Sequence, residues 1–269
     1  MQQYLGLPPL ASAHGAEIDQ MLGIVHWLMV ILFVGWGAFY AYSVIRFRRK
    51  NNPRADYTGV RRHTSSYVEA GVAIFEAVLI IAFAIPLWAK RVNAFPPEKD
   101  AVAVRVVAQQ FQWNIHYPGP DGKFGRTDIK LVDEESNPVG LDRNDPDGKD
   151  DIVLPNQLHL PVNRPVIIYL SSKDVVHSFF LPVMRIKQDV IPGQVIPVWF
   201  IPTKTGDYEI ACAQLCGLGH YRMRGYLTVE TQEEFDAWIK DQESYLQDAS
   251  SSSGQEQERS SETSMSMAH

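Results

Sequence analysis

Two long apolar runs separated by a basic segment constrain the fold of this chain more than any other feature. Residues 22–45 form a run of 24 residues without a charged side chain, and a second apolar run, residues 68–89, ends just before Lys90 and Arg91. Each run is long enough for a helix to cross the roughly 30 Å hydrocarbon core of a membrane. The sequence therefore predicts a two-helix transmembrane hairpin over residues 22–95.

The charges around the runs predict their orientation. Residues 46–62 carry seven Lys and Arg side chains against the single acid Asp56, and short basic loops stay on the cytoplasmic side of a membrane. Residues 1–21 lack the charged start and cleavage site of a secretion signal, so we expect an N-terminal extracytoplasmic segment there. The hairpin then lies in a bacterial cytoplasmic membrane, with the rest of the chain on the periplasmic side.

One histidine and two glutamates lie within the apolar runs. Glu69 lies near the cytoplasmic end of the second run, and Glu76 lies about two turns deeper on the same face. A carboxylate in a membrane span is costly and is a functional candidate by default. The alternative is a snorkelling or neutral glutamate in a helix contact. We interpret His26, one turn into the first run, as an interfacial hydrogen-bonder rather than a ligand.

Strand-like alternation begins after Pro96 and Pro97. Val102, Val104 and Val106 face one way, and the aromatic stretch from Phe111 to Tyr117 continues the pattern. Further strands are expected over residues 164–171, 175–181, 194–201, 207–211 and 225–229. This spacing predicts an all-β sandwich or barrel over residues 96–247.

The end of the chain combines a helix with a polar tail. Thr231 and Glu234 form a capping-box pattern, and apolar residues follow at helical spacing, so one face of this helix should pack on the β-domain. The Ser/Gln/Glu composition of residues 248–269 cannot form a core and predicts disorder.

An acidic segment interrupts the β-region. Residues 133–151 carry eight acidic and two basic side chains but lack the ligand order of an EF-hand. The segment is either a solvated loop or a docking patch for a basic partner protein; an acidic surface that included Asp174 and residues 142–151 would steer such a partner. The net charge of −6, without a basic run in the soluble part, argues against nucleic acid as a partner.

One short segment gathers soft metal donors. Residues 209–225 contain both cysteines of the chain, Cys212 and Cys216, together with His220 and Met223. Thiolates, imidazole and thioether suit copper. A disulfide between the two cysteines and a Cys2His2-type zinc site are alternatives, but neither uses Met223. The sequence has no Cys-x-x-Cys-His motif for covalent haem.

This segment resembles the copper loop of cytochrome c oxidase subunit II, in which Cys-x-Glu-x-Cys-Gly-x-x-His-x-x-Met carries the dinuclear CuA centre. Residues 174–182 and 187–193 are similar to the segment of that family that bears the first histidine ligand and to the turn that follows it. The resemblance covers roughly residues 20–247. It implies a cupredoxin-like fold for the β-region.

The resemblance also implies a site and a role. Cys212 and Cys216 would bridge two copper ions, with His177 and His220 each binding one of them. Met223 and the backbone carbonyl of Gln214 would be weak axial donors. The chain would accept electrons from a c-type cytochrome and pass them to haem in the catalytic subunit I of an oxidase with further subunits. Oxygen is reduced to water there, and no substrate chemistry occurs in this chain.

Some positions depart from the family pattern or extend it. Gln214 replaces a glutamate whose side chain reaches a magnesium ion shared with the catalytic subunit, so magnesium is less strongly implied. Phe111 stands where the family usually has the tryptophan through which electrons enter, and Trp113 follows two residues later. Glu69 corresponds to a glutamate near a proton channel of the catalytic subunit, whereas Glu76 has no counterpart.

Two other protein classes share parts of this pattern. A membrane-anchored copper-delivery protein would also bind copper, but sites that release metal tend to be exposed and mononuclear. Quinol-oxidase subunits II share the fold but have lost the copper ligands that this chain retains.

Overall fold

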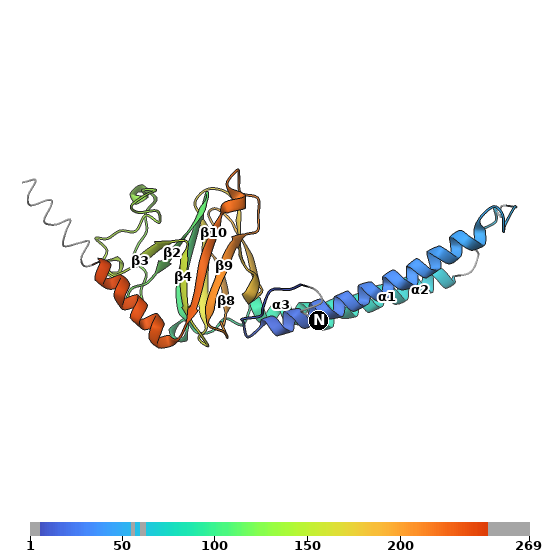
Figure 1. The fold of residues 1–269 in the computed structure, drawn as a ribbon, viewed down its shortest axis with the longest axis horizontal. Helices are drawn as coiled ribbons and strands as arrows, with labels where there is room; N and C mark the ends of the chain where they lie inside the picture. Colours follow the sequence, from blue (N-terminus) through green and yellow to red (C-terminus); the bar gives the residue numbers. More distant parts are fainter. Residues whose placement is uncertain (1–5, 55–56, 60–62, 247–269) are drawn as a thin grey trace, which may run out of the picture. The chain divides into compact units, whose positions relative to one another are not determined.

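The computed structural model describes residues 6–54, 57–59 and 63–246, and the chain forms two compact units. One unit contains Met1–Leu7 and Gly15–Ala94, and the other contains Pro8–His14 and Phe95–His269. The first unit is helical and the second is a β-domain (Figure 1). Residues 55–56 and 60–62 of the predicted cytoplasmic loop and the tail predicted to be disordered, 248–269, lie outside the described residues.

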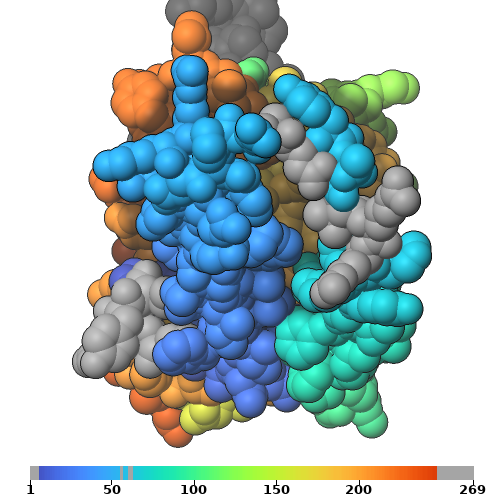
Figure 2. Space-filling view, turned by 90° about the vertical axis from the view of Figure 1, so that its right-hand side faces the viewer, coloured from blue at the N-terminus to red at the C-terminus, as the bar shows by residue number. Residues whose placement is uncertain are grey.

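The helical unit is a hairpin of two candidate membrane spans. Helix α1 (Gly15–Phe47) is longer than the predicted apolar run, and the returning span (Thr64–Val92) has a mean hydropathy of 2.4. The two helices lie side by side (Figure 2), with a cleft of about 590 Å³ between them at Trp27 and Gly71. An ion pair of 3.2 Å between Lys90 Nζ and Glu17 Oε1 joins the ends that lead towards the β-domain.

The second span contains an irregularity that the sequence analysis did not predict. It runs as α2 (Thr64–Leu79), a π-helical turn (Ile80–Ala84) and α3 (Ile85–Val92). Pro86 has no backbone N–H, and its ring collides with the preceding turn of a regular helix. The wider turn places the N–H of Ile85 on the carbonyl of Ile80, five residues back, and so accommodates the proline without ending the span.

The β-domain consists of two five-stranded sheets packed face to face, as the sequence predicted. One sheet has the order β3-β2-β1-β5-β8 and the other β4-β10-β9-β6-β7. Most neighbouring strands are antiparallel, whereas β1 pairs with β5, and β4 with β10, in parallel. The strands are β1 (Val102–Gln109), β2 (Gln112–Tyr117), β3 (Ile152–Pro155), β4 (Gln157–Pro161), β5 (Val166–Ser172), β6 (His177–Leu181), β7 (Ile186–Val190), β8 (Ile196–Phe200), β9 (Gly206–Cys212) and β10 (Arg224–Glu230).

Alternation along the strands builds the core between the sheets. Val104 and Val106 of β1 are fully buried, whereas Arg105 between them points to the outer face. Trp113, Ile115 and Tyr117 of β2 face inward as expected, but Phe111 lies in the turn before β2 rather than in a strand.

Three strands were not predicted from the sequence. β3 and β4 are short and end at Pro155 and Pro161, so each offers too few alternating residues for a clear signal. β7, which we had interpreted as part of a turn, buries only its terminal Ile186 and Val190. It is an edge strand, where charged central residues are typical.

The residues before α1 belong to the β-domain. Ala11 is fully buried there; its N–H donates to the carbonyl of Val183 (2.9 Å), and its carbonyl accepts from the N–H of Thr203 (2.8 Å). Residues 8–14 are therefore part of the β-domain rather than of a separate N-terminal segment ending at residue 21.

The C-terminal helix follows the predicted pattern. Residues 232–246 are helical, and the capping box forms: the Glu234 carboxylate accepts from the Thr231 N–H (2.9 Å), and the Thr231 hydroxyl accepts from the Glu234 N–H (3.3 Å). Phe235 enters the core, and Trp238 stacks on the His159 ring at 4.2 Å. This helix is thus anchored on the domain by its apolar face.

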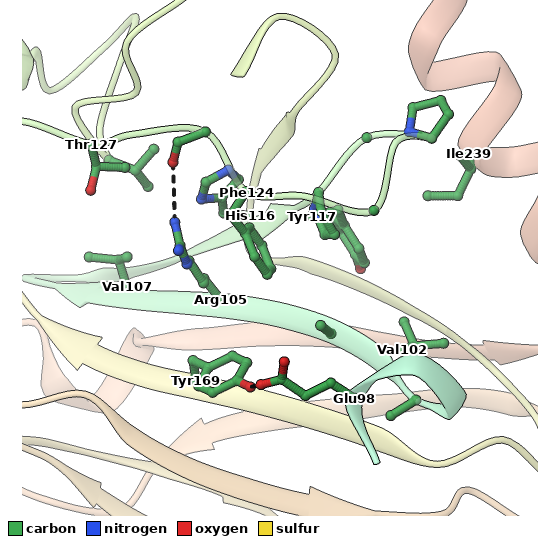
Figure 3. A pocket seen from close by; sticks show the side chains of 18 of the residues that line it. Glu98, Val102, Arg105, Val107, His116, Tyr117, Phe124, Thr127, Tyr169 and Ile239 are labelled. Atoms are coloured by element: carbon green, nitrogen blue, oxygen red, sulfur yellow. Dashed lines mark hydrogen bonds between the residues drawn. The ribbon is translucent and has the colours of Figure 1, made fainter. Parts of the chain in front are cut away.

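The long connection between β2 and β3 folds back over the outer face of the first sheet. Residues 118–127 of this connection line a cleft of about 1280 Å³ together with side chains of β1 and β5. In Figure 3, Arg105 donates to a carbonyl on this loop, that of Gly125, and lies beside Phe124, whose ring its guanidinium covers at 4.2 Å. Tyr169 hydrogen-bonds Glu98 nearby. None of the soft metal donors lines this cleft.

Candidate metal centre

The soft donors lie at the ends of three neighbouring strands of the second sheet. His177 is the first residue of β6, Cys212 is the last of β9, and Met223 directly precedes β10. Phe179 pairs with Cys212 across the sheet, so the β6–β9 register brings His177 beside the cysteine loop. Residues 213–223 connect β9 to β10; this cysteine loop carries Cys216 and His220 and ends at Met223.

The donor atoms form one compact cluster. The two cysteine sulfurs are 3.8 Å apart; His177 Nδ1 lies 3.9 Å from Cys212 Sγ, and His220 Nδ1 lies 3.6 Å from Cys216 Sγ. Met223 Sδ lies 3.7 Å from Cys216 Sγ, and the Gln214 carbonyl oxygen lies 3.2 Å from Cys212 Sγ. Two donors at about 2.0–2.3 Å from one ion, in tetrahedral directions, are themselves about 3.3–3.8 Å apart. The spacing therefore fits metal binding.

The sulfur separation also decides against one alternative. A disulfide requires an S–S distance of about 2.05 Å, whereas both thiols are free and 3.8 Å apart. The cysteine pair in this structure is a pair of candidate ligands.

The two histidines lie on different sides of the cysteine pair. Among the described residues, one group of His, Cys, Asp and Glu side chains is compact enough for an ion, and it contains His177, Cys212 and Cys216 with donor atoms within 4.8 Å of one another. His220 is not part of that group, although it lies beside Cys216. The compact group therefore holds one histidine, and the second histidine lies beside the other cysteine.

The surroundings of the two cysteines lower the pKa of one thiol and raise the pKa of the other. Burial opposes ionisation of Cys212, but hydrogen bonds from His177 and from backbone amides outweigh it and lower its pKa to about 6. Burial and the neighbouring Cys212 charge raise the pKa of Cys216 to about 11. One thiolate is therefore present at neutral pH, and thiolate is the form that binds metal.

Asp174 orients His177 from the side opposite Cys212. The Nε2–H of His177 donates to Asp174 Oδ1 at 2.8 Å, which leaves Nδ1 facing the cysteine. Burial works against the charge on this imidazole, yet its bonds to Cys212 and Asp174 raise its pKa overall. A carboxylate that holds the second nitrogen of a ligating histidine fixes the ring and its tautomer.

The two aromatic candidates for electron transfer occupy different positions. Trp113 is fully buried, with its ring edge-on to His177 and Phe179, so it offers no surface to a docked protein. Phe111 is partly buried and packs on the backbone of the cysteine loop at Gly217 and Gly219. Of the two, Phe111 alone lies where a partner could reach it.

The acidic segment offers less free charge than its sequence indicates. Asp151 is fully buried and accepts from His116 and two backbone amides; Asp142 is largely buried and bonded to Arg126. The Asp174 side chain is 29% exposed and holds His177 and the Gln110 amide. The expectation that residues 142–151 and Asp174 form one open acidic surface is therefore wrong for Asp142 and Asp151.

The polar residues of the hairpin divide into bonded and unbonded groups. The Nδ1–H of His26 donates to the Leu22 carbonyl at 2.7 Å, in keeping with a hydrogen-bonding role. Glu69 and Glu76 both lie in α2 with exposed side chains, and no bond joins either to another described residue. Their predicted roles in a proton path stay predictions.

Two contributors to the centre were missed from the sequence. Asp174 had been interpreted only as a surface charge, although its position three residues before His177 was an available signal. Gln110, whose side-chain amide donates to the Cys216 carbonyl at 2.5 Å, carries no local signal, because it lies 106 positions from that residue.

Comparisons with known proteins agree with this architecture. Residues 102–230 match the family described as cytochrome c oxidase subunit II, periplasmic domain. The chain is 36% identical over 238 residues to the alternative cytochrome c oxidase subunit 2 of Bradyrhizobium diazoefficiens, covering 88% of this chain and 84% of that protein. It is 28% identical over 256 residues to the cytochrome c oxidase subunit 2 of Synechocystis sp., covering 87% and 75%.

A solved structure is also similar to part of the chain. It is the crystal structure of the periplasmic domain of subunit II of cytochrome oxidase from Bradyrhizobium japonicum, at 28% identity, a TM-score of 0.40, and coverage of 54% of this chain and 95% of that one. The two apolar helices and the match to a periplasmic domain describe a membrane-anchored subunit. With the extent and identity of the sequence matches, this chain belongs to the cytochrome c oxidase subunit II family and is a subunit of a haem-copper oxidase.

Proposed function

We propose that this chain is the subunit through which electrons enter the oxidase. In this proposal the six donors hold a dinuclear copper (CuA) centre, which takes electrons from a c-type cytochrome and passes them to haem in the catalytic subunit I. The hairpin lies in a bacterial cytoplasmic membrane with the β-domain in the periplasm.

The arrangement of the two histidines carries the proposal. His177 adjoins Cys212 and His220 adjoins Cys216, while the two sulfurs lie between them. Two ions that share both sulfurs would each reach one histidine. Met223 beside Cys216 and the Gln214 carbonyl beside Cys212 supply one further weak donor on each side.

The protein supplies position and burial, whereas bound copper would supply one-electron redox chemistry. His177 and Met223 are almost wholly buried, and the donors are attached to three strands of one sheet. Ligands on such a frame keep their geometry when the charge of the site changes. Asp174 holds the imidazole of His177 in the orientation that directs Nδ1 towards Cys212.

The burial and number of the donors also argue against the alternative functions. A copper-delivery site must release its ion, but Cys216 is 4% exposed and the donors come from two separate loops. A mononuclear zinc site of the Cys2His2 type would use four donors and would leave Met223 and the Gln214 carbonyl without a role. Quinol-oxidase subunits lack these ligands.

Copper analysis and electron paramagnetic resonance of the copper-loaded full-length chain in detergent test the proposal. We expect two coppers per chain and a seven-line hyperfine pattern, because one unpaired electron would be shared by two nuclei. One copper per chain, a four-line pattern, or zinc bound in preference to copper would reject the dinuclear site. A Trp238→Phe variant, altered only in the C-terminal helix, should retain the full signal.

The surface around the loop indicates how a donor could dock. Leu218 is 97% exposed, and Leu215 and Tyr221 are also exposed, next to the partly buried Phe111. We propose that the cytochrome contacts this apolar rim, with electrons entering near Phe111.

Charge steering would then come from residues 133–135 and from the other partly exposed acidic side chains of the segment 133–151. Donor oxidation should fall with ionic strength, and indifference to salt would remove the steering component.

Two further assignments extend the proposal to the catalytic subunit. Glu69 would admit protons from the cytoplasmic side: Glu69→Gln should slow oxygen reduction while copper content and copper reduction stay unchanged, and Glu76→Gln tests whether the deeper carboxylate shares the role. Full turnover in Glu69→Gln would show that this residue has only a structural role.

A shared magnesium ion is only weakly supported, because Gln214 offers a neutral amide; magnesium analysis of the purified complex would decide it.

A further inference from the structure

The turn between β1 and β2 contacts both ligand-bearing loops. This turn consists of Gln110 and Phe111. The backbone N–H of Gln110 donates to Asp174 Oδ2 at 2.7 Å, and the other oxygen of that carboxylate holds His177. The side-chain amide of Gln110 donates to the carbonyl of Cys216 at 2.5 Å. One residue therefore links the His177 loop to the cysteine loop.

The cysteine loop is shaped to receive this turn. A Cβ atom on Gly217 would lie 2.7 Å from Gln110 Nε2, and one on Gly219 would lie 2.4 Å from the Phe111 ring. Gly217 also has a φ of +135°, a conformation that side chains disfavour. The two glycines thus allow the β1–β2 turn and the cysteine loop to approach more closely than any larger residue would permit.

The middle of the cysteine loop has little other support. At the start of the loop, β9 pairs with β6, and the Ala213 N–H donates to the Ser178 carbonyl. At the end of the loop, the Met223 carbonyl accepts a hydrogen bond from the Cys212 N–H. Within the described residues, the Gln110 side chain makes the one hydrogen bond to residues 214–219 from a distant part of the chain, and the flanking Cys212 and Met223 make sulfur contacts there. The other bonds there are turns within the loop itself.

We propose that Gln110 is a positioning residue for the metal centre, which sets the placement of Cys216 and its neighbours relative to His177. The inference rests on the proposed copper site. Gln110 is exposed and its side chain adds nothing to the core. Its removal should therefore loosen the ligand loop without unfolding the domain.

Gln110→Met tests this, because methionine keeps the length of the side chain and removes the donor. Gln112→Met is the matched control: Gln112 lies two residues on, but its amide donates to Asn114 Oδ1 instead of to the loop. The full-length chain in detergent is used for both variants.

The first measurement needs no metal. Because Cys216 is buried, its alkylation by iodoacetamide requires the loop to open, and mass spectrometry can follow this site alone. We expect alkylation of Cys216 to be about five to ten times faster in Gln110→Met than in the wild type, as the loss of one partly buried hydrogen bond implies. Gln112→Met should react at the wild-type rate, and thermal unfolding should be unchanged in both.

The second measurement uses the copper-loaded chain. Gln110→Met should lose copper to a chelator about tenfold faster and show altered hyperfine couplings and reduction potential, which a purely structural residue would not change. Wild-type rates and spectra in Gln110→Met would overturn the inference. If the wild type fails to bind two coppers, the proposed function fails instead, and the alkylation experiment still reports whether Gln110 holds Cys216.

Discussion

Two irregular segments of the β-domain use their polar residues in opposite ways. In the 118–151 segment, polar groups satisfy one another: Asp151 accepts from His116 and from the amides of Gly119 and Gly125, and one nitrogen of Arg143 donates to three carbonyls. In the cysteine loop, sulfur and imidazole groups converge at 3.6–3.9 Å with only weak bonds among themselves. The first arrangement stabilises a fold, and the second leaves donors available for a ligand.

This difference shows which local property marks a functional loop. The 118–151 segment is rich in acidic residues, yet its buried carboxylates accept hydrogen bonds from donors in the same connection and in the adjoining strands. The cysteine loop has fewer charges, but its sulfur and imidazole donors point to one place and make only long contacts of 3.6–3.9 Å with one another. Convergence of donors on one place is therefore more informative than the number of polar residues.

Removing a cysteine should give the largest effect on function. Cys216→Ser deletes a sulfur that adjoins Cys212, His220 and Met223, and a serine oxygen is a poor ligand for copper. We expect loss of the two-copper signal and at least a hundredfold slower donor oxidation by the assembled oxidase. A variant that retained both coppers would contradict the bridging role. Thermal unfolding of the copper-free chain serves as the control and should change little.

Removing the central acceptor of the other segment should act on stability instead. Asp151→Ala leaves the buried His116 Nε2 and two backbone amides without an acceptor. Orphaned buried donors of this kind cost roughly 3 kcal/mol of unfolding free energy in total. Denaturant unfolding measures the loss. The copper spectrum of the folded fraction should match the wild type, and a changed spectrum would mean that the two segments are coupled.

Altering the partner of His177 should have an intermediate effect on the metal centre. Asp174→Asn keeps the shape of the side chain but removes the charge that orients the imidazole. Changes to such partners of ligating histidines weaken metal affinity by about tenfold or more. Competition with a copper chelator measures this. Asp207→Asn, at the far end of β9 from Cys212, should show wild-type affinity; an equal loss in both variants would point to net charge rather than orientation.

The smallest expected effect is a pH dependence of stability. Burial lowers the pKa of His116, the bond to Asp151 opposes this, and the charges of Arg105 and Arg143 lower it further. The unfolded chain therefore binds a proton at a higher pH than the folded chain does. The stabilisation is fully present above the ordinary histidine pKa of about 6.5 and is lost as pH falls through the lower folded value, at up to about 1.4 kcal/mol per pH unit.

Comparing the wild type with His116→Gln isolates this contribution. Glutamine still donates to Asp151 but does not titrate. The difference in unfolding free energy should stay constant above pH 7 and shift in favour of the variant as the pH falls to 5.5. A difference that does not change with pH would show that His116 is not the titrating group.

Local patterns determined much of this protein. Apolar run length identified both membrane helices, alternation identified most strands, and the spacing of Cys212, Cys216, His220 and Met223 defined most of the donor set. Each of these signals lies within a few turns or one strand, where backbone periodicity decides which side chains share a face. The capping box at Thr231 formed for the same reason.

Only the tertiary structure decided how distant segments meet. The β6–β9 register brings His177 to Cys212 across 35 positions, the β1–β2 turn places Gln110 on the cysteine loop, and residues 8–14 join the β-domain through Val183 and Thr203. Contacts between distant residues also decide which acidic side chains are fully hydrogen-bonded. Asp151, for example, accepts from His116, 35 positions away. Strand order and register depend on the packing of the whole core rather than on any local period, so the sequence alone could name most of the donors but not the groups that hold them in place.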